Sequence, residues 1–372
     1  MKITHLWLLN FRNYENATLD FADNNLLVGL NGAGKTNVLE AIDILATSRS
    51  RIVNGLNKCI RRGQAGFALR GRFDCVPAGH CAPHPPLTVA LRQERGAGRV
   101  IKINEETLSR ASELLGRVNS VFFLPSDLEI IHGQPLQRRK YLDVVISQTE
   151  PDYCRALQLY VRALKQRNEL LKNLRVRSLS GVEMSGVDSL SVWDAQLADN
   201  AARIMVKRQE YLEFFAREAA QFYKDMGFAG ALALKYKTET LSDGQKNIQA
   251  LQNSRAADLR FGRTHFGPHT DDFEIYLNEN KAADFCSQGQ KRLIALALKC
   301  AEVKIKRQKL NDPPLVLVDD VLLELDLTRL NKIITAIAPG SQKIFTITDT
   351  SRFAPELLEG MKIIKVDNGR IV

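Results

Sequence analysis

Residues 29–36, with the sequence GLNGAGKT, decide the fold of this chain. They match the phosphate-binding pattern G-x-x-x-x-G-K-[ST], follow the short apolar run Asn25–Val28, and open a segment, Asn37–Ala46, whose apolar residues have helical spacing. Glycines let successive backbone N–H groups point at one phosphate cluster, and the start of the helix adds a partial positive charge. The sequence therefore predicts an ATP-binding loop formed by Gly29, Leu30, Asn31, Gly32, Ala33, Gly34, Lys35 and Thr36.

The last two residues of this loop have chemistry of their own. Lys35 supplies a point charge to the β- and γ-phosphates of ATP, and the Thr36 hydroxyl can bind Mg²⁺. Such a site also needs a carboxylate, and the buried-strand pattern Leu315–Val318 runs directly into Asp319 and Asp320. We expect Asp319 to complete the Mg²⁺ site with Thr36, and Asp320 to orient or deprotonate the attacking water.

A second anion-binding pattern lies upstream of the aspartate pair. The residues Ser287-Gln288-Gly289-Gln290 begin a segment with helical spacing. A serine, a glycine and a helix N-terminus together can bind a phosphate. One chain does not need two such sites for one nucleotide, so we expect two chains to enclose ATP. Ser287, Gly289 and Gln290 of one chain would face the γ-phosphate bound by the other.

In this order the three motifs are those of ATP-binding-cassette (ABC) ATPases, and the chain resembles the RecF family of bacterial recombination and repair ATPases, which is related to SMC head domains. The resemblance extends over nearly the whole sequence. It rests on FRNYENATLDF, GLNGAGKTNVLEAI, FFLPSDLEIIHGQPLQRRKYLD, GPHTDDFEIYLN, SQGQKRLIALALKCAE and DDVLLELD.

The resemblance implies roles for further residues. Arg12, in the FRNY segment, is similar to the residue that reaches the phosphates beside the loop. Lys35 and Asp320 occupy the catalytic positions. Glu324 and Asp326 resemble the D-loop, which crosses the dimer interface in the family.

The resemblance also implies a function. Members of the family are DNA-binding ATPases that dimerise on ATP at gapped or junction DNA and, with RecO and RecR, promote the loading of RecA. They support replication-fork maintenance and SOS induction. We therefore expect a slow, DNA-stimulated ATPase that uses ATP and Mg²⁺ as a switch. Thr270 stands where the family usually has arginine, so the contacts of that arginine are not expected here.

The pattern along the chain predicts an α/β fold with two lobes. Residues 1–134 and 262–372 should form an ABC-type ATPase lobe, with a mixed sheet and an antiparallel subdomain that includes strands within 66–103. Residues 135–261 place apolar residues at helical spacing and contain few β-branched runs. We expect this segment to form an inserted all-helical lobe, compact rather than drawn out into a long coiled-coil arm.

The chain is basic, because 52 Lys and Arg residues exceed 42 Asp and Glu residues and give a formal net charge of +10. This excess favours an anionic partner, either nucleic acid or a membrane surface, and no segment approaches the roughly 20 apolar residues of a membrane span. No basic strand is interleaved with aromatic residues, so we expect contacts to duplex phosphates with little base recognition. The candidate DNA-binding residues are Arg49, Arg51, Arg61, Arg62, Arg138, Arg139 and Lys140.

The cysteines are scattered along the sequence, which favours a reducing cytoplasm over a disulfide framework. Cys75, His80, Cys81 and His84 lie close together. Their spacing does not follow the usual zinc-binding pairs, and neighbouring prolines stiffen the loop, so a hairpin loop is favoured over a zinc site.

Three alternatives explain part of the pattern. An ATPase subunit of a membrane transporter would not carry a helical insert of this size. An OLD-type defence ATPase would need a nuclease domain with an acidic cluster after the cassette. A DNA-binding scaffold without catalysis would not need Lys35, Thr36, Asp319 and Asp320 together. Stimulation of ATP turnover by gapped DNA separates the repair ATPase from all three.

Overall fold

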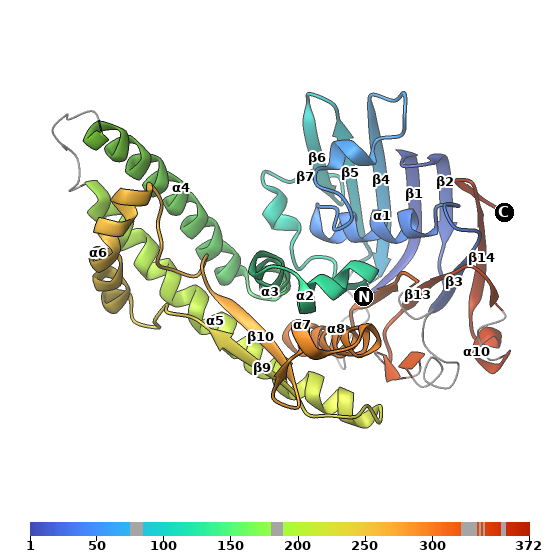
Figure 1. Ribbon diagram of the computed structural model, residues 1–372. Helices are drawn as coiled ribbons and strands as arrows, with labels where there is room; N and C mark the ends of the chain where they lie inside the picture. Colours follow the sequence, from blue (N-terminus) through green and yellow to red (C-terminus); the bar gives the residue numbers. More distant parts are fainter. Residues whose placement is uncertain (75–84, 180–188, 321–332, 335, 338, 351–354) are drawn as a thin grey trace. The chain divides into compact units, whose positions relative to one another are not determined.

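The computed structural model divides into two compact units (Figure 1). Unit 1 contains Met1–Asp127, Phe222–Phe228 and Leu296–Val372, and unit 2 contains Leu128–Gln221 and Ala229–Ala295. The structure describes residues 1–74, 85–179, 189–320, 333–334, 336–337, 339–350 and 355–372.

Unit 1 contains an antiparallel sheet with the strand order β2-β1-β4-β5-β6-β7. Its strands are β1 (Lys2–Phe11), β2 (Tyr14–Asp20), β4 (Gly66–Asp74), β5 (Leu87–Glu94), β6 (Gly98–Ile103) and β7 (Glu106–Thr107). Leu6 and Leu8 of β1 are buried, whereas Trp7 and Leu9 are exposed. This alternation is expected of a sheet that packs one face against the core, and it confirms the predicted antiparallel strands.

The second sheet of unit 1 has the order β15-β14-β3-β13-β12-β8. Its strands are β3 (Asn24–Val28), β8 (Ser120–Phe123), β12 (Leu315–Val318), β13 (Lys343–Ile347), β14 (Lys362–Asp367) and β15 (Arg370–Ile371). All pairings are parallel except that of the terminal hairpin β14–β15. All four residues of β12 are buried, because this strand lies inside a parallel sheet.

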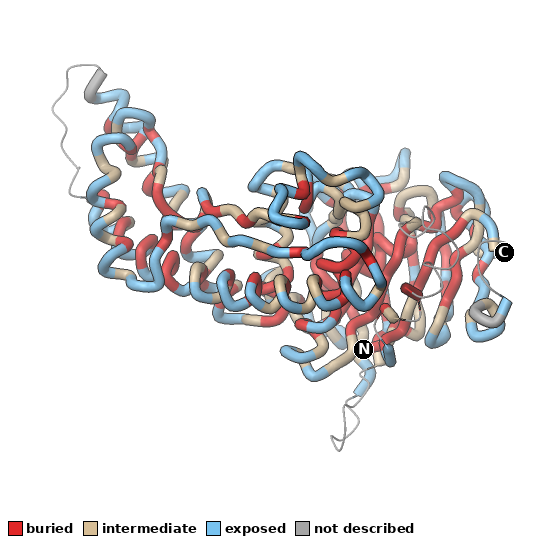
Figure 2. The backbone as a smooth tube through the Cα atoms, turned by 60° about the horizontal axis from the view of Figure 1, so that its bottom comes forward, coloured by how far each residue is buried: buried red, intermediate tan, exposed pale blue. Residues whose placement is uncertain are grey.

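Helix α1 (Lys35–Thr47) packs against β4 and β5 of the antiparallel sheet and against β8 and β13 of the parallel sheet. Nearly all of its residues are buried, as expected for a helix that contacts a sheet on both sides. The buried residues of unit 1 follow these strands (Figure 2). Other described elements of this unit are η1 (Leu56–Cys59), η2 (Ala111–Leu114), most of η3 (Pro125–Leu128), the part of α8 (Gln288–Leu310) from Leu296 onward, and α10 (Pro355–Glu359).

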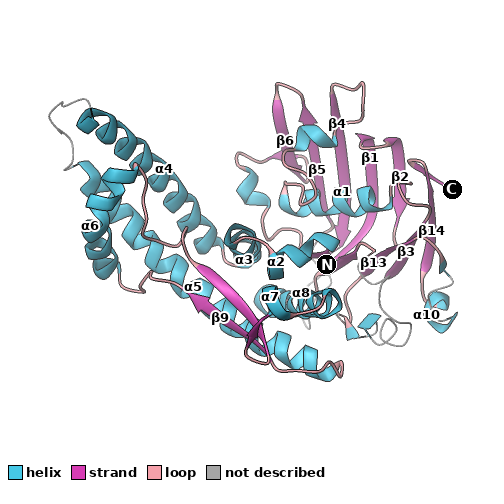
Figure 3. Ribbon diagram, viewed as in Figure 1, coloured by secondary structure: helices cyan, strands magenta, loops and turns pink. Residues whose placement is uncertain are grey.

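Unit 2 is mostly helical but also contains a small antiparallel sheet (Figure 3). Its helices are α2 (Glu129–His132), α3 (Pro135–Thr149), α4 (Pro151–Leu179), most of α5 (Leu190–Asp225), α6 (Gly244–Phe261) and α7 (Ala282–Phe285). The sheet has the order β11-β10-β9, formed by β9 (Leu232–Lys237), β10 (Asp272–Leu277) and β11 (Asn280–Lys281).

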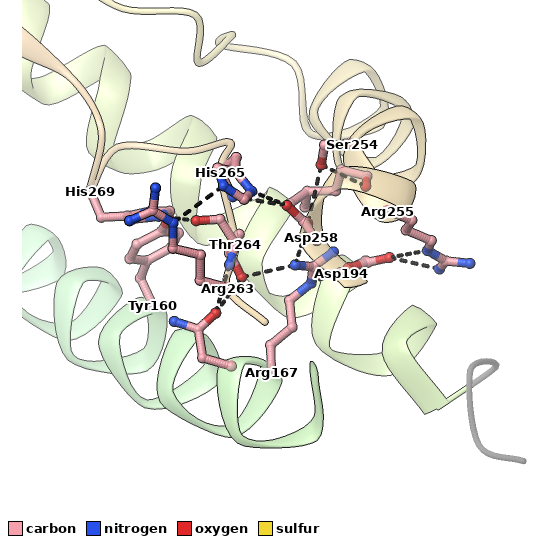
Figure 4. Close-up of polar contacts among 12 residues, drawn as sticks. Tyr160, Arg167, Asp194, Ser254, Arg255, Asp258, Arg263, Thr264, His265 and His269 are labelled. Carbon is pink, nitrogen blue, oxygen red and sulfur yellow. Dashed lines mark hydrogen bonds and ion pairs between the residues drawn. The ribbon is translucent and has the colours of Figure 1, made fainter. Parts of the chain in front are cut away.

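A buried ionic cluster joins the helices of unit 2 (Figure 4). Arg167 of α4 is fully buried, and it donates to Asp194 of α5 at 2.7 Å and to Asp258 of α6 at 2.6 Å. Asp258 also accepts from the backbone N–H of His265 at 3.0 Å. Three helices and the segment after α6 are therefore held by one set of buried charges.

The mixed α/β fold is confirmed, with two differences from the sequence-based expectation. The segment 135–261 is not all-helical, because β9 forms within it and pairs with β10. That pairing also explains why residues 262–295 belong to unit 2, whereas the sequence placed them in the ATPase lobe. The change from one unit to the other falls inside the continuous helix α8.

Candidate functional site

The loop 29–34 connects the buried strand β3 to helix α1, as the sequence predicted. Gly32 and Gly34 have φ angles of 80° and 118°, which residues with side chains rarely adopt. A Cβ atom on Gly34 would also lie 2.8 Å from Nδ2 of Asn13. Glycine is therefore favoured at position 34 for two reasons. The backbone has a positive φ angle, and the Asn13 side chain lies too close for a Cβ atom.

The start of α1 presents hydrogen-bond donors. The helix has no side-chain cap, and the backbone N–H groups of Gly32, Gly34, Lys35 and Thr36 have no acceptor among the described residues. The Lys35 ammonium lies over the same loop and donates to the carbonyls of Gly29, at 2.7 Å, and Leu30, at 3.1 Å. A helix N-terminus with free N–H groups and an adjacent cation is suited to bind an anion with several oxygens, such as a polyphosphate.

The aspartate pair meets this loop. A pocket is lined by residues of both segments, namely Asn31, Gly32, Gly34, Lys35, Thr36, Asn37 and Asp320. The Thr36 hydroxyl donates to the Asp319 carboxylate, with Oγ1 lying 2.7 Å from Oδ1 and 2.9 Å from Oδ2. The pairing of β12 with β13, and of β13 with β3, brings together two segments far apart in sequence.

The chemistry of these side chains fits a Mg²⁺ ion. Adjacent ligands of octahedral Mg²⁺ with bonds of about 2.0–2.1 Å lie roughly 3 Å apart, close to the separation of the Thr36 and Asp319 oxygens. Burial raises the pKa of Asp319, while hydrogen bonds from Thr36 and Thr346 act in the opposite direction. A nearby divalent cation would favour the ionised carboxylate.

Thr346 of β13 also belongs to this site, although it was not among the residues predicted from the sequence. Its hydroxyl lies 2.9 Å from Oδ1 of Asp319 and 3.2 Å from Oδ1 of Asp320, and it accepts from the backbone N–H of Asp320 at 3.0 Å. Asp320 has a φ angle of 46°, so its backbone is held in the left-handed region. The one available signal was a hydroxyl residue inside the apolar strand KIFTI.

The Arg12 side chain forms an ion pair within the protein. Its Nε and Nη2 each lie 2.7 Å from a carboxylate oxygen of Glu40, a buried residue of α1, and Nη1 donates to the Lys58 carbonyl. Burial lowers the pKa of Arg12, but the Glu40 carboxylate outweighs this effect and the net shift is upward. Arg12 is thus a charged partner of Glu40, and its contact with a nucleotide stays a prediction.

The signature segment begins α8, as predicted. The Ser287 hydroxyl accepts from the backbone N–H of Gln290 at 3.2 Å, and the Gln290 side chain accepts from the N–H of Ser287 at 2.9 Å. This reciprocal pair is a capping box. Ser287 and Gly289 are exposed, and a Cβ atom on Gly289 would meet nothing closer than the Ser287 hydroxyl at 4.0 Å. The motif is therefore ordered and accessible, and its contact with a second chain stays a prediction.

The predicted D-loop residues Glu324 and Asp326, and the cysteine- and histidine-containing loop 75–84, lie outside the described residues.

The basic DNA-binding candidates fall into two groups. Four of them are engaged in ion pairs or hydrogen bonds within the protein: Arg51, Arg61, Arg138 and Arg139. Arg138 is firmly held, because its guanidinium donates twice to Asp272, at 2.7 and 2.8 Å. The other three are exposed and make no ion pair with any described residue: Arg49, Arg62 and Lys140. In the part of the chain that the structure describes, no helix has the length and apolar character needed to span a membrane.

The segment GPHTDD is a structural junction of unit 2. The Thr270 hydroxyl donates to the Gly267 carbonyl at 2.7 Å and closes a turn. Asp271 accepts from Tyr236 and Thr238, at 2.6 and 2.7 Å, and Asp272 accepts from Arg138. The two aspartates thus connect β9, β10 and α3. Thr270, where the family usually has arginine, closes a turn at the surface.

Two sheets around a buried helix, a loop of free N–H groups and a hydroxyl–carboxylate pair define a P-loop protein with the ABC ATPase fold. The model of the RecF/RecN/SMC N-terminal domain matches residues 2–371. The "DNA replication and repair protein RecF" of Synechococcus sp. (strain JA-3-3Ab) is 35% identical, with 100% of this chain and 97% of the relative covered. That of Microcystis aeruginosa is 33% identical, with both chains covered completely. The chain belongs to the RecF family.

Solved structures agree with this assignment. The "recombination mediator protein RecF-ATP in RecFOR pathway" is 31% identical, superposes with a TM-score of 0.88, and is matched over 100% of this chain and 96% of the other. The SMC head domain of Pyrococcus furiosus, with 18% identity and a TM-score of 0.57, shows the fold alone.

Proposed function

We propose that this chain is an ATP-dependent DNA-binding protein of recombinational repair. The relatives that match the whole chain are named as DNA replication and repair proteins, and a similar structure is that of RecF with ATP in the RecFOR pathway. The observation that carries the proposal is the hydrogen bond between Thr36 and Asp319, which lies beside four N–H groups that have no acceptor among the described residues. This arrangement would join a phosphate site to a metal site.

The residues of this site have separate proposed roles in ATP hydrolysis. The N–H groups of the loop and the Lys35 ammonium hold the phosphates, and Thr36 and Asp319 would hold Mg²⁺, which neutralises phosphate charge when bound. Asp320 lines the same pocket, and this supports the role proposed for it, which is to orient the attacking water. Hydrolysis would be slow and stimulated by DNA, so that it serves as a switch.

The exposed capping box at Ser287 supports an ATP-dependent dimer. An accessible surface suited to bind an anion is formed by Ser287, Gly289 and the N-terminus of α8. The loop 29–36 already offers one phosphate site for a nucleotide, so this second surface is available for a nucleotide bound by another chain. We infer that Ser287, Gly289 and Gln290 contact the γ-phosphate of ATP bound by a second copy. The closed dimer would hold double-stranded or gapped DNA through phosphate contacts, to which Arg49, Arg62 and Lys140 contribute as exposed cations.

The proposed partners follow from the family. With RecO and RecR, the dimer would promote the loading of RecA and so support replication-fork maintenance and SOS induction. The "RecFOR pathway" of the similar RecF structures is consistent with this place in repair.

The central experiment measures ATP turnover with and without gapped duplex DNA. We expect measurable hydrolysis that rises when DNA is added and falls in Lys35→Arg, which keeps the charge but changes the geometry of the donor. DNA binding should weaken steeply with salt. A rate of ATP hydrolysis that does not change when DNA is added would contradict the proposal. A DNA affinity that does not change with salt concentration would also contradict it.

A second experiment tests the dimer. Ser287→Arg should abolish ATP-driven dimerisation, measured by light scattering, while nucleotide binding by the monomer stays unchanged. Ser242→Arg is a matched control, because Ser242 is also exposed and also lies beside a helix N-terminus, that of α6. Dimerisation that persists in Ser287→Arg would refute the two-chain site.

A further inference from the structure

One carbonyl of the phosphate-binding loop is held from outside the loop. The Ala33 oxygen accepts from Nδ2 of Asn13 at 2.9 Å and from the backbone N–H of Gly369 at 2.9 Å. Asn13 lies in the turn between β1 and β2, and Gly369 lies in the turn between β14 and β15. The two turns come from opposite ends of the chain and meet at one peptide group.

The direction of this carbonyl fixes the direction of a donor. A trans peptide group is planar, so the N–H of Gly34 points away from the carbonyl of Ala33. Two hydrogen bonds to the carbonyl therefore aim the Gly34 N–H away from both turns. Gly34 lines the pocket of the loop, and its N–H has no acceptor among the residues that the structure describes.

The next peptide group is held in a similar way. The Tyr14 hydroxyl donates to the Gly34 carbonyl at 3.1 Å, in addition to the N–H groups of Asn37 and Val38 in the first turn of α1. Tyr14 is fully buried, and burial raises its pKa, so the hydroxyl keeps its proton and remains a donor. By holding the Gly34 carbonyl, this hydrogen bond orients the N–H of Lys35, which belongs to the same peptide group.

Close packing leaves these groups little room to turn. A Cβ atom on Gly29 would lie 2.1 Å from the Val366 carbonyl oxygen, and one on Gly369 would lie 2.4 Å from the Asn13 carbonyl oxygen. The loop thus lies directly against the C-terminal hairpin, and that hairpin lies directly against the Asn13 turn.

We propose that the turn at Asn13 and Tyr14 and the C-terminal turn Asp367–Arg370 are positioning elements for nucleotide binding. They orient the N–H groups of Gly34 and Lys35 before the phosphates arrive, so that binding does not have to reorganise the loop. The inference rests on the proposed ATP site. It adds a role for the C-terminal turn, which acts on the nucleotide site through the Ala33 carbonyl of the loop.

The test compares nucleotide affinity in Asn13→Ala, Tyr14→Phe and Gly369→Ala by calorimetric titration with ATP and with ADP. Loss of one oriented hydrogen bond should weaken the Kd for either nucleotide about three- to tenfold. In Gly369→Ala the added methyl group and the φ angle of 78° displace the turn, so the loss should be at least as large. KM for ATP should rise more than kcat falls.

Two control variants separate positioning from stability. Tyr236→Phe removes a hydroxyl hydrogen bond in unit 2, and Asn253→Ala removes a side-chain amide on α6. Both should keep the affinity of the unchanged protein, whatever their melting temperatures. Tyr14→Phe keeps the buried ring, so it provides a folded variant if Asn13→Ala does not fold.

The outcomes are distinct. If the unchanged protein binds no nucleotide, the proposed function fails. If it binds nucleotide and Tyr14→Phe and Gly369→Ala bind equally well, the ATP site stands and the positioning role is refuted. Weaker binding in these two variants, with unchanged binding in both controls, supports the positioning role.

Discussion

Replacement of Arg167 by methionine tests whether the buried ionic cluster holds unit 2 together. The guanidinium has no exposed surface and makes three hydrogen bonds, to Asp194 at 2.7 Å, Asp258 at 2.6 Å and Thr264 at 2.8 Å (Figure 4). Methionine preserves much of the apolar stem but removes the charge. Two buried carboxylates then lose their shared partner.

The expected cost follows from what each carboxylate retains. Removing one partner of a buried ion pair costs about 3–5 kcal/mol, because the other charge stays buried without compensation. Here Asp194 keeps Arg255 at 2.7 Å, and Asp258 keeps His265 at 2.8 Å. We therefore expect Arg167→Met to lose about 3 kcal/mol of unfolding free energy, at the low end of that range.

The assay is urea unfolding followed by tryptophan fluorescence. The chain has two tryptophans, Trp7 in β1 of unit 1 and Trp193 beside Asp194 in α5. In a Trp7→Phe background, the signal therefore reports on the helical unit next to the cluster. Arg162→Met is the matched control, because Arg162 is exposed on the same helix, and surface changes cost about 0.5 kcal/mol or less.

Two results would refute this reasoning. A loss below about 1 kcal/mol in Arg167→Met would mean that the cluster contributes no more than one ordinary hydrogen bond. An equal loss in Arg162→Met would mean that the effect belongs to helix α4 in general and not to the buried charges.

Three further predictions concern unit 1. Thr346→Val removes the hydroxyl beside Asp319, and phosphate release should fall about tenfold, the rate equivalent of one lost hydrogen bond; unchanged release would contradict its role. Burial lowers the pKa of Lys306 from 10.5 to about 8 in the folded state. Between pH 8 and pH 10.5 the unfolded chain therefore binds more protons than the folded protein. The unfolding free energy should rise with pH across this window, by at most about 1.4 kcal/mol per pH unit. Urea titrations should show that Lys306→Met lacks this rise. Glu40→Gln weakens the pair with Arg12 and should lower unfolding free energy by about 1–3 kcal/mol in the same assay, whereas an unchanged midpoint would show that the pair is not stabilising.

The sequence was most informative where local rules dominate. The strand, the glycine loop and the helix around residues 29–36 follow one another along the chain. The residue types at neighbouring positions are therefore enough to predict their conformation. The capping box at Ser287 is also local, because its donors and acceptors lie three residues apart.

The sequence was less informative where pairing is distant. Residues 232–237, LALKYK, are a short alternating run next to long helical segments. They form β9 because β10, about 40 residues later, supplies the partner strand. The same pairing moves residues 262–295 into unit 2. Strand propensity depends on such neighbours more than helix propensity does, which explains the direction of the error.

The sequence by itself determined the class of protein, the phosphate loop and the two aspartates, because each is encoded by residue type and short spacing. Only the tertiary structure decided which other groups act on that site. Asn13, Thr346 and Gly369 reach it from the first strands, from β13 and from the last hairpin. Tertiary structure likewise separated the engaged cations, such as Arg138, from the exposed ones. The physical reason is that hydrogen bonds and ion pairs depend on distances of about 3 Å, and strand pairing sets those distances between residues hundreds of positions apart.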